Sequence, residues 1–159
     1  MQRVSDNERR LKEAGEWGER GLPQGSRLLE ELREQARAAQ SSAYAPYSGL
    51  RLGTALLASD GSIHRGCNVE NASYGLTNCA ERTAAFAGIA QGRGGFVVGV
   101  LVSSTEQPVL PCGACRQVLS ELGSDLRLAC EGQDSSTVRW VSIAGLLPDA
   151  MGAEDLPER

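Results

Sequence analysis

Three cysteines and one glutamate form the pattern in this sequence that is most able to carry out chemistry. The stretch "NCAERT", residues 78–83, places Cys79 two positions before Glu81, and "PCGACRQ", residues 111–117, holds Cys112 and Cys115. Such thiols can serve as redox groups, as core packing or as metal ligands. Only a metal site also gives the carboxylate of Glu81 a role.

A zinc ion held by three protein ligands keeps a fourth position open. Cys112 and Cys115 are three residues apart, so both sulfurs face one side of a first helical turn, and Cys79 can add a ligand from another helix. Water at the open position becomes acidic enough to attack a substrate near neutral pH. Glu81 can reach past the sulfur of Cys79 and carry the proton. We therefore predict a catalytic zinc site with Glu81 as proton shuttle.

Two other interpretations of these cysteines stay open from the residues alone. Cys112 and Cys115 match a redox C-x-x-C motif, which also occurs at helix starts. A structural zinc module is the second, but it needs a fourth ligand. His64, the one histidine, falls in a predicted strand where we expect it to face solvent. Neither interpretation explains the nearby glutamate, and we expect Cys67 and Cys130 to be small core residues.

The charge of such a site needs compensation. Three thiolates outweigh the charge of Zn²⁺, and thiolate donation weakens zinc as a Lewis acid. Donors to the sulfurs withdraw this negative charge and keep a bound water acidic. Arg82 and the N-termini of the two predicted helices are the candidates for that role.

Apolar periodicity and turn signals predict an α/β fold around these motifs. From Ser26, "SRLLEELREQARAAQSSA" has helical spacing, and "LRLGTALLAS" and "SIHRGCNV" flank an Asp60-Gly61 turn that is typical of a β-hairpin. The cysteine motifs then open two predicted helices, "TNCAERTAAFAGIAQG" and "CGACRQVLSELG". "GFVVGVLVSS", "LRLACE" and "TVRWVSI" are typical of strands, and "AGLLPDA" of a last helical turn. This order predicts three α-β-α layers with a mixed five-stranded sheet.

Length and composition limit the class of protein. The chain has 159 residues and a net charge of −4, which favours an ordinary-sized domain with a small-molecule partner over a protein that binds nucleic acid by charge. We expect residues 1–25 to be an arm, either disordered or a loosely docked helix, before a catalytic domain at residues 26–159. No apolar run suits a membrane span or a signal peptide, so we expect a cytoplasmic protein. In that reducing compartment, the odd total of five cysteines argues against a disulfide framework.

The two cysteine motifs together resemble a known signature. "CAE" followed by "PCxxC" is similar to the motif of zinc-dependent nucleoside deaminases, with Cys79 in the place of a histidine. From about Ser26 to Leu156 the chain resembles the cytidine deaminase family, specifically its small homotetrameric type with a three-cysteine zinc site. The segments that carry the resemblance are "AYAPYSG", "GCNVENASYGLTNCAERTA", "PCGACRQVL" and the late "LLP" and "EDL".

This resemblance implies a role for each matching residue. The three cysteines would hold one Zn²⁺ per subunit, Glu81 would move protons, and Asn68 and Glu70 would hydrogen-bond the ribose hydroxyls. Tyr74 and the backbone at Ala80 would lie near the nucleoside. The implied reaction is hydrolytic deamination of cytidine and deoxycytidine to uridine and deoxyuridine, with release of ammonia. The implied assembly is a homotetramer in which neighbouring subunits complete each site, and no nucleic acid or membrane is expected as partner.

Two positions depart from the family pattern at the base pocket. Relatives typically read "SGFRVG" where this chain reads "SGLRLG", so Leu50 replaces an aromatic residue beside the pyrimidine. The tail "LLPDAMGAEDL" places Met151 where a phenylalanine commonly covers the base. Stacking of a base on an aromatic side chain is worth roughly 1–3 kcal/mol. A second hypothesis is therefore deamination of a modified cytosine nucleoside or a nucleoside antibiotic, and a polynucleotide substrate is disfavoured by the acidic charge.

Overall fold

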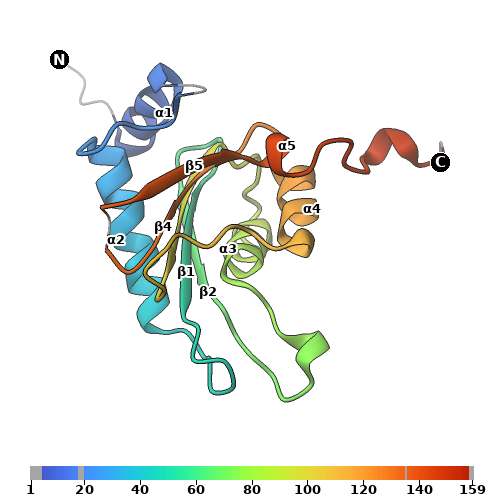
Figure 1. Ribbon diagram of the computed structural model, residues 1–159. Helices are drawn as coiled ribbons and strands as arrows, with labels where there is room; N and C mark the ends of the chain where they lie inside the picture. The colour runs from blue at the N-terminus through green and yellow to red at the C-terminus, as the bar shows by residue number, and fades with distance from the viewer. Residues whose placement is uncertain (1–4, 18–19, 135, 158–159) are drawn as a thin grey trace.

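The computed structural model describes residues 5–17, 20–134 and 136–157, and it places a central sheet between two layers of helices (Figure 1). The helices are α1 (Asp6–Trp17), α2 (Arg27–Ser41), α3 (Ala80–Ala90), α4 (Gly113–Leu122) and α5 (Ile143–Leu146), with short 3-10 turns at Tyr74–Leu76 and Ala153–Asp155. The strands are β1 (Leu52–Leu57), β2 (Ile63–Cys67), β3 (Val98–Ser103), β4 (Arg127–Glu131) and β5 (Val138–Ser142). None of the helices described combines the length and apolarity needed to cross a bilayer.

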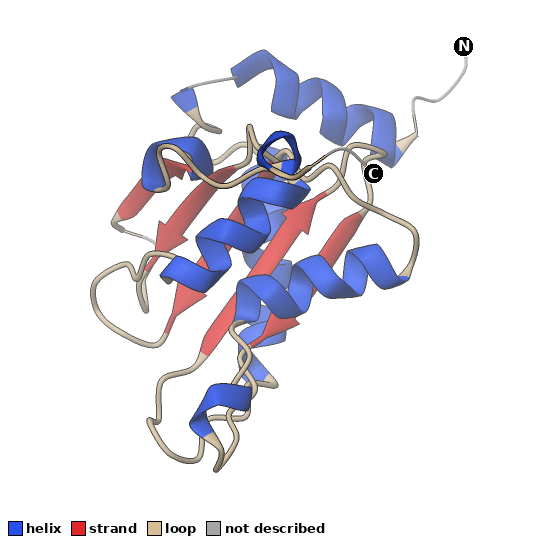
Figure 2. Cartoon of the chain, turned by 90° about the vertical axis from the view of Figure 1, so that its right-hand side faces the viewer, coloured by secondary structure: helices blue, strands red, loops and turns tan. Residues whose placement is uncertain are grey.

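The strands form one mixed sheet in the order β2-β1-β3-β4-β5. β1 pairs antiparallel with both β2 and β3, β4 runs parallel to β3, and β5 runs antiparallel to β4. Gly61, with a φ of 81°, closes the predicted β1–β2 hairpin. Helix α4 makes the crossover that the parallel pair requires. Because helices cover both faces of this sheet (Figure 2), the predicted three-layer α-β-α fold is confirmed.

Helix α2 forms one outer layer because its apolar stripe follows the helical period. Ser26 caps its N-terminus by accepting a hydrogen bond from the Leu29 N–H at 3.3 Å. The apolar residues of this stripe are buried against β1 and β3: Leu28, Leu29, Leu32, Ala36 and Ala39. A Cβ at Gly53 of β1 would overlap the carbonyl oxygen of Ala36, so only glycine allows this close approach. β1 is therefore fixed directly against α2.

Helices α3 and α4 cover the opposite face and bring the cysteine motifs to it. Ala80, Ala84 and Ala85 of α3 and Leu119 of α4 are fully buried in the core on this side. Small side chains let α3 lie close to β2, where a Cβ on Gly66 would overlap the backbone nitrogen of Ala84. The two helices also contact each other. This packing fixes the start of one helix relative to the start of the other.

Helix α1 docks on α2 through charged and capping contacts. Arg10 donates from Nε to the Glu31 carboxylate of α2 at 3.0 Å, and Glu13 accepts a hydrogen bond from the Leu28 N–H at 2.9 Å. Glu13 thus satisfies one of the free N–H groups in the first turn of α2. The segment that follows buries Leu22 in the core. Residues 6–17 of the predicted arm are therefore helical, and the domain boundary at residues 25 and 26 stays a prediction.

His64 does not face solvent, and that expectation was wrong. Its side chain is 6% exposed, its ring meets Phe96 edge-on with centroids 6.3 Å apart, and its Nε2 lies 2.8 Å from the Ser62 hydroxyl. The reason is that α3 covers this face of the edge strand β2, which the strand's own sequence does not reveal. Of the two cysteines expected in the core, Cys130 is buried and Cys67 is half-buried.

A buried ion pair joins α2 to β4. Glu131 is fully buried, and Arg33 donates to its carboxylate from Nε and Nη2 at 2.7–3.0 Å. These hydrogen bonds raise the pKa of Arg33 above its ordinary value. Arg37 approaches the second carboxylate oxygen at 3.8 Å. Because both charges are desolvated, losing either partner leaves the other uncompensated.

We expect Arg33→Met to lower the free energy of unfolding by about 3 kcal/mol, near the lower limit for breaking a buried pair, because Arg37 remains beside Glu131. Urea denaturation measures this change. Arg27→Met is the matched control, since Arg27 lies on the same helix with a side chain that is 71% exposed. Equal losses of stability in the two variants would contradict a role for the buried pair.

Candidate active site

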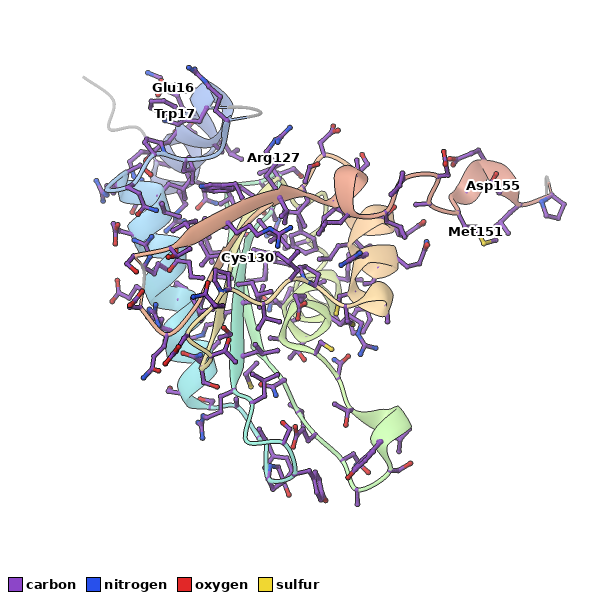
Figure 3. All side chains as sticks on the ribbon, in the orientation of Figure 1. Glu16, Trp17, Arg127, Cys130, Met151 and Asp155 are labelled. Atoms are coloured by element: carbon purple, nitrogen blue, oxygen red, sulfur yellow. The ribbon has the colours of Figure 1, made fainter. Side chains whose placement is uncertain are left out.

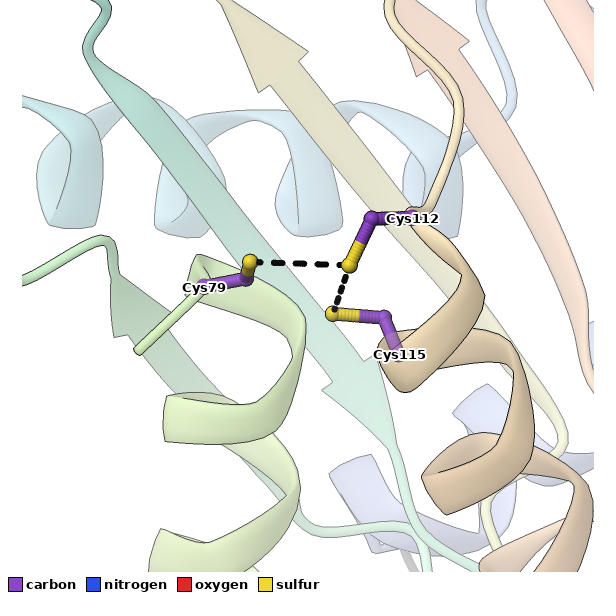
Figure 4. Close-up of side chains that lie close together, drawn as sticks. All are labelled: Cys79, Cys112 and Cys115. Atoms are coloured by element: carbon purple, nitrogen blue, oxygen red, sulfur yellow. Dashed lines mark hydrogen bonds between the residues drawn. The ribbon is translucent and has the colours of Figure 1, made fainter. Parts of the chain in front are cut away.

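Two helix N-termini converge at the cysteine motifs (Figure 4). Cys79 is the N-cap residue of α3 and Cys112 the N-cap residue of α4, both with extended backbone angles and no side-chain cap hydrogen bond. Cys115 lies in the first turn of α4 and is buried. The unpaired N–H groups and the positive end of each helix dipole favour a thiolate over a thiol at these positions.

The three sulfur atoms are close enough to bind one ion. Cys112 Sγ lies 3.8 Å from Cys79 Sγ and 3.6 Å from Cys115 Sγ, and all three sulfurs lie within 4.8 Å of one another. Tetrahedral zinc with Zn–S bonds of about 2.3 Å requires sulfurs roughly 3.8 Å apart. Cys112 is exposed, which leaves one side of the cluster open. The donor atoms and their spacing therefore fit a zinc ion with an accessible side.

Arg82 lies where it can offset the charge of the sulfurs. Its Nη2 is 3.7 Å from Cys79 Sγ and 3.3 Å from the carbonyl oxygen of Thr77. Hydrogen bonds from Cys115 and Arg82 lower the pKa of Cys79 to about 5. The hydrogen bond with Cys79 and burial raise the pKa of Cys115 above its ordinary value. One thiolate is thus favoured by the protein itself, and Arg82 lies beside it.

Glu81 is buried beside the cluster with one oxygen unpaired. Its side chain is 2% exposed, and its Oε2 has no hydrogen-bond partner among the residues that the structure describes. Burial, together with the negative charge of Cys79, raises the pKa of Glu81 to about 7. A carboxyl group with a pKa near neutrality can both accept and donate a proton at pH 7. Buried polar atoms without a partner are uncommon in proteins, and this oxygen is available to a ligand at the sulfur cluster.

Asn68 has a structural task that the sequence did not reveal. It is 5% exposed, its Oδ1 accepts a hydrogen bond from the Leu52 N–H at 2.8 Å, and its Nδ2 donates to the Leu50 carbonyl at 2.8 Å. The side chain therefore links the end of β2 to the chain entering β1.

Glu70 and Tyr74 line a shallow pocket with three neighbours. The Glu70 carboxylate accepts hydrogen bonds from the Ser48 hydroxyl and from the backbone N–H of Tyr47 at 2.9 Å, and these bonds lower its pKa. The rings of Tyr47 and Tyr74 lie 6.1 Å apart, and Thr77 completes the lining. Sequence reasoning missed Tyr47 and Ser48 as pocket residues, although the "AYAPYSG" segment was a signal for them. The structure thus assembles this pocket from two segments far apart in the chain.

The two expected walls of the base pocket lie apart within one chain. Leu50 is half-buried before β1 and packs against the core. Met151 is 58% exposed on the tail beyond α5, which leaves the body of the fold (Figure 3). Ala80, by contrast, is fully buried at the start of α3, between Cys79 and Glu81. One chain therefore brings together the cysteines, Ala80, Glu81 and Arg82, but it does not bring Met151 to them.

Comparison with known proteins assigns this arrangement to a family. Residues 26–130 match the family model described as the cytidine and deoxycytidylate deaminase zinc-binding region, and this match includes both cysteine motifs. The chain belongs to the cytidine deaminase family. The family model begins where α2 is capped and ends in β4, so it includes α3 and α4, which carry the three cysteines, but not β5, α5 or the tail.

Individual cytidine deaminases match nearly over their full length. The chain is 47% identical over 125 residues to the cytidine deaminase of Halalkalibacterium halodurans, a match that covers 79% of this chain and 95% of that protein. It is 43% identical over 126 residues to the cytidine deaminase of Mycobacterium tuberculosis, covering 79% and 91%. The crystal structure of the cytidine deaminase from Burkholderia pseudomallei matches with a TM-score of 0.72 at 50% identity, covering 77% and 98%. The predicted family and fold are confirmed.

Removing one sulfur should abolish metal binding. We expect purified Cys79→Ala to retain less than about a tenth of the zinc of the parent protein, because metal affinity depends on the full ligand set. Inductively coupled plasma mass spectrometry measures the metal content. Cys67→Ala is the matched control, since Cys67 lies in β2 outside the cluster and should leave zinc unchanged. Full zinc in Cys79→Ala would contradict the assignment of the ligands.

Proposed function

We propose that this protein catalyses zinc-dependent hydrolytic deamination of cytidine and deoxycytidine to uridine and deoxyuridine, with release of ammonia. The observation that carries the proposal is the buried Glu81 carboxylate with its unpaired Oε2, next to three sulfurs spaced for one zinc ion. A metal with an open side and a proton shuttle are the parts that this hydrolysis needs. Relatives at 43–50% identity, named cytidine deaminases, support the choice of substrate.

Cys79, Cys112 and Cys115 would hold one Zn²⁺ per subunit. When bound, zinc supplies Lewis acidity that activates water for attack on the base. Arg82, 3.7 Å from the Cys79 sulfur, withdraws negative charge from the thiolates and so preserves this acidity. The partial positive charges at the N-termini of α3 and α4 also stabilise negative charge on these sulfurs.

Glu81 would move protons between water and substrate. Its Oε2 takes a proton from the attacking water as the water oxygen bonds to C4 of cytosine. The carboxyl group then donates this proton to the ring nitrogen N3, takes a second proton from the hydroxyl now on C4, and passes it to the departing amino nitrogen. The C4–N bond breaks, so cytidine and water become uridine and ammonia without oxidation or reduction. The raised pKa of Glu81, about 7, suits a group that must both take up and release protons.

We propose Glu70 and Asn68 as the groups that hold the ribose. Two backbone N–H groups and a hydroxyl already fix the Glu70 carboxylate, which keeps further lone pairs for sugar hydroxyls. The side chain of Asn68 holds the neighbouring backbone in place. We therefore propose that Asn68 affects ribose binding partly through the position of Glu70. Tyr74 and the backbone at Ala80 complete the set of proposed nucleoside contacts.

Leu50 and Met151 are the proposed walls of the base pocket. Both are aliphatic, but methionine adapts its shape to an irregular partner and can cover a flat base. Deamination of a modified nucleoside or an antibiotic is not favoured, because relatives as similar as 50% identical are named cytidine deaminases. Plain cytidine and deoxycytidine are therefore the substrates we propose.

We also propose that the active assembly is a homotetramer. Phe86 and Ile89 lie three residues apart on α3 with 47% and 45% of their surfaces exposed, and Val69 and Leu76 near the site are exposed as well. Exposed large apolar side chains support burial against a partner. Met151, on the projecting tail, is also exposed and could be buried in the same way. Contacts between copies would complete each site with a residue from a neighbour.

The setting that we propose is pyrimidine salvage in the cytoplasm. All five cysteines of the chain are free, which supports a reducing compartment. Conversion of free cytidine to uridine would return one pyrimidine nucleoside to the pool of another, which is why we propose salvage.

Glu81→Gln tests the proposed chemistry, since the amide keeps the shape of the carboxyl group but does not shuttle protons. We expect kcat for ammonia release from cytidine to fall by about 10²- to 10⁴-fold, the usual contribution of general acid–base catalysis. Zinc content should stay equal to that of the parent protein. A zinc-replete Glu81→Gln with unchanged kcat would rule out the shuttle.

Phe86→Glu tests the assembly by placing a charge on the exposed apolar surface of α3. We expect light scattering after size exclusion to show a species smaller than a tetramer, with the circular dichroism of the parent fold and with less activity per subunit. Gln107→Glu, at an exposed loop position, is the control for added charge and should stay tetrameric. A tetrameric Phe86→Glu would exclude this surface from the interface.

A further inference from the structure

Asn78 begins a short chain of side-chain hydrogen bonds that ends on the backbone of Cys79. Its Nδ2 donates to the Thr83 hydroxyl at 3.0 Å, and that hydroxyl donates to the Cys79 carbonyl at 3.1 Å. The Thr83 N–H donates to the same carbonyl at 3.0 Å, as the first intrahelical bond of α3. Because a hydroxyl has one proton and two lone pairs, Thr83 can accept from Asn78 and donate to Cys79 at once. The Asn78 side chain is thereby attached to the first turn of α3.

The backbone of Asn78 is bonded to a second segment of the site. Its N–H donates to the Val69 carbonyl at 3.0 Å, and the Val69 N–H donates to the Asn78 carbonyl at 2.9 Å. Val69 lies between Asn68 and Glu70, the proposed ribose groups. Asn78 therefore connects the segment of the proposed ribose contacts to the helix that begins at the sulfur cluster.

The sulfur of Cys79 takes its position from the backbone that enters α3. Cys79 is the N-cap residue and its side chain makes no cap hydrogen bond, so the N–H groups of the helix do not hold the sulfur. The bond from Asn78 to Thr83 ties the entering backbone to the helix. Cys112 Sγ, 3.8 Å from Cys79 Sγ, belongs to α4. A displacement of the backbone before α3 would therefore change the spacing between the two sulfurs.

We infer that Asn78 is a positioning residue, which fixes Cys79 for metal binding through the hydroxyl of Thr83. This inference rests on the proposed function and deepens it, because it names a residue that determines how tightly the sulfur cluster holds zinc. A ligand that is already fixed loses less conformational freedom when it binds. Groups that orient metal ligands through hydrogen bonds therefore contribute to metal affinity without touching the metal.

Asn78→Ala is the first variant to measure, by competition for Zn²⁺ with a chromophoric chelator. We expect its zinc dissociation constant to rise about 10-fold, the lower limit for losing a group that orients a metal ligand, because the Thr83 N–H still holds the Cys79 carbonyl. Asn7→Ala is the matched control, since Asn7 Nδ2 donates to the Asp60 carbonyl at 3.1 Å from α1, outside the helices that carry the cysteines. An unchanged dissociation constant in Asn78→Ala would overturn the inference.

Cobalt in place of zinc distinguishes positioning from a general loss of stability. The absorption spectrum of Co²⁺ bound to thiolates depends on the type and the arrangement of its ligands. We expect the Co²⁺ spectrum of Asn78→Ala to differ from that of the parent protein, and that of Asn7→Ala to match it. A parental spectrum in Asn78→Ala would show that the sulfurs keep their places without this side chain, and would overturn the inference.

Thr83→Val tests the route of the effect, because it removes the hydroxyl and keeps the shape of the side chain. If Asn78 acts through this hydroxyl, Thr83→Val also raises the zinc dissociation constant, and adding Asn78→Ala raises it no further. Multiplication of the two separate effects would overturn the inference, as would a Thr83→Val variant with the zinc affinity of the parent.

These metal measurements need no substrate, so they separate the inference from the proposed function. Absence of ammonia release by the zinc-replete parent, together with weaker zinc binding in Asn78→Ala, would refute the deamination alone. Ammonia release by the parent, together with equal zinc binding in parent and Asn78→Ala, would refute the positioning role alone. A parent protein that binds no zinc would refute both.

Discussion

The site depends on one constraint, that two helices on the same face of the sheet must begin at the same point. Cys79 and Cys112 are N-cap residues, so their sulfurs meet only because α3 and α4 are fixed relative to each other. That fixing comes from small residues, since alanines let α3 lie against β2 where Gly66 has no side chain. Close packing of the helix layer is thus the basis of the ligand geometry.

The same convergence addresses the electrostatic difficulty of a site with three thiolates. Helix N-termini and Arg82 supply positive charge at the sulfurs, while the interior around Glu81 supplies a low dielectric and no partner for Oε2. The two environments shift the two pKa values in opposite directions. A thiolate is favoured at Cys79, while the carboxyl group of Glu81 keeps its proton up to near neutrality. Glu81, the proposed acid–base group, and Cys79, a proposed metal ligand, can therefore lie two residues apart and serve different roles.

Local patterns predicted most of the fold and the cluster. The cap at Ser26, the Asp60-Gly61 turn and the spacing of Cys112 and Cys115 are local signals, and each helix and strand expected from them is present. What escaped prediction depends on contacts between distant segments. The burial of His64 follows from α3 covering its strand, and the bond from Gln117 to Met151 spans 34 residues. No window of sequence contains both partners of such contacts.

The proposed chemistry requires that three sulfurs hold zinc with one side open beside Glu81. X-ray absorption at the zinc edge of the purified protein tests it most directly, because it counts the ligand atoms and their distances. We expect three sulfurs at about 2.3 Å and one oxygen or nitrogen at about 2.0–2.2 Å. A shell of four sulfurs would contradict it, since a closed site of that kind stabilises structure and leaves no position at which water could be activated.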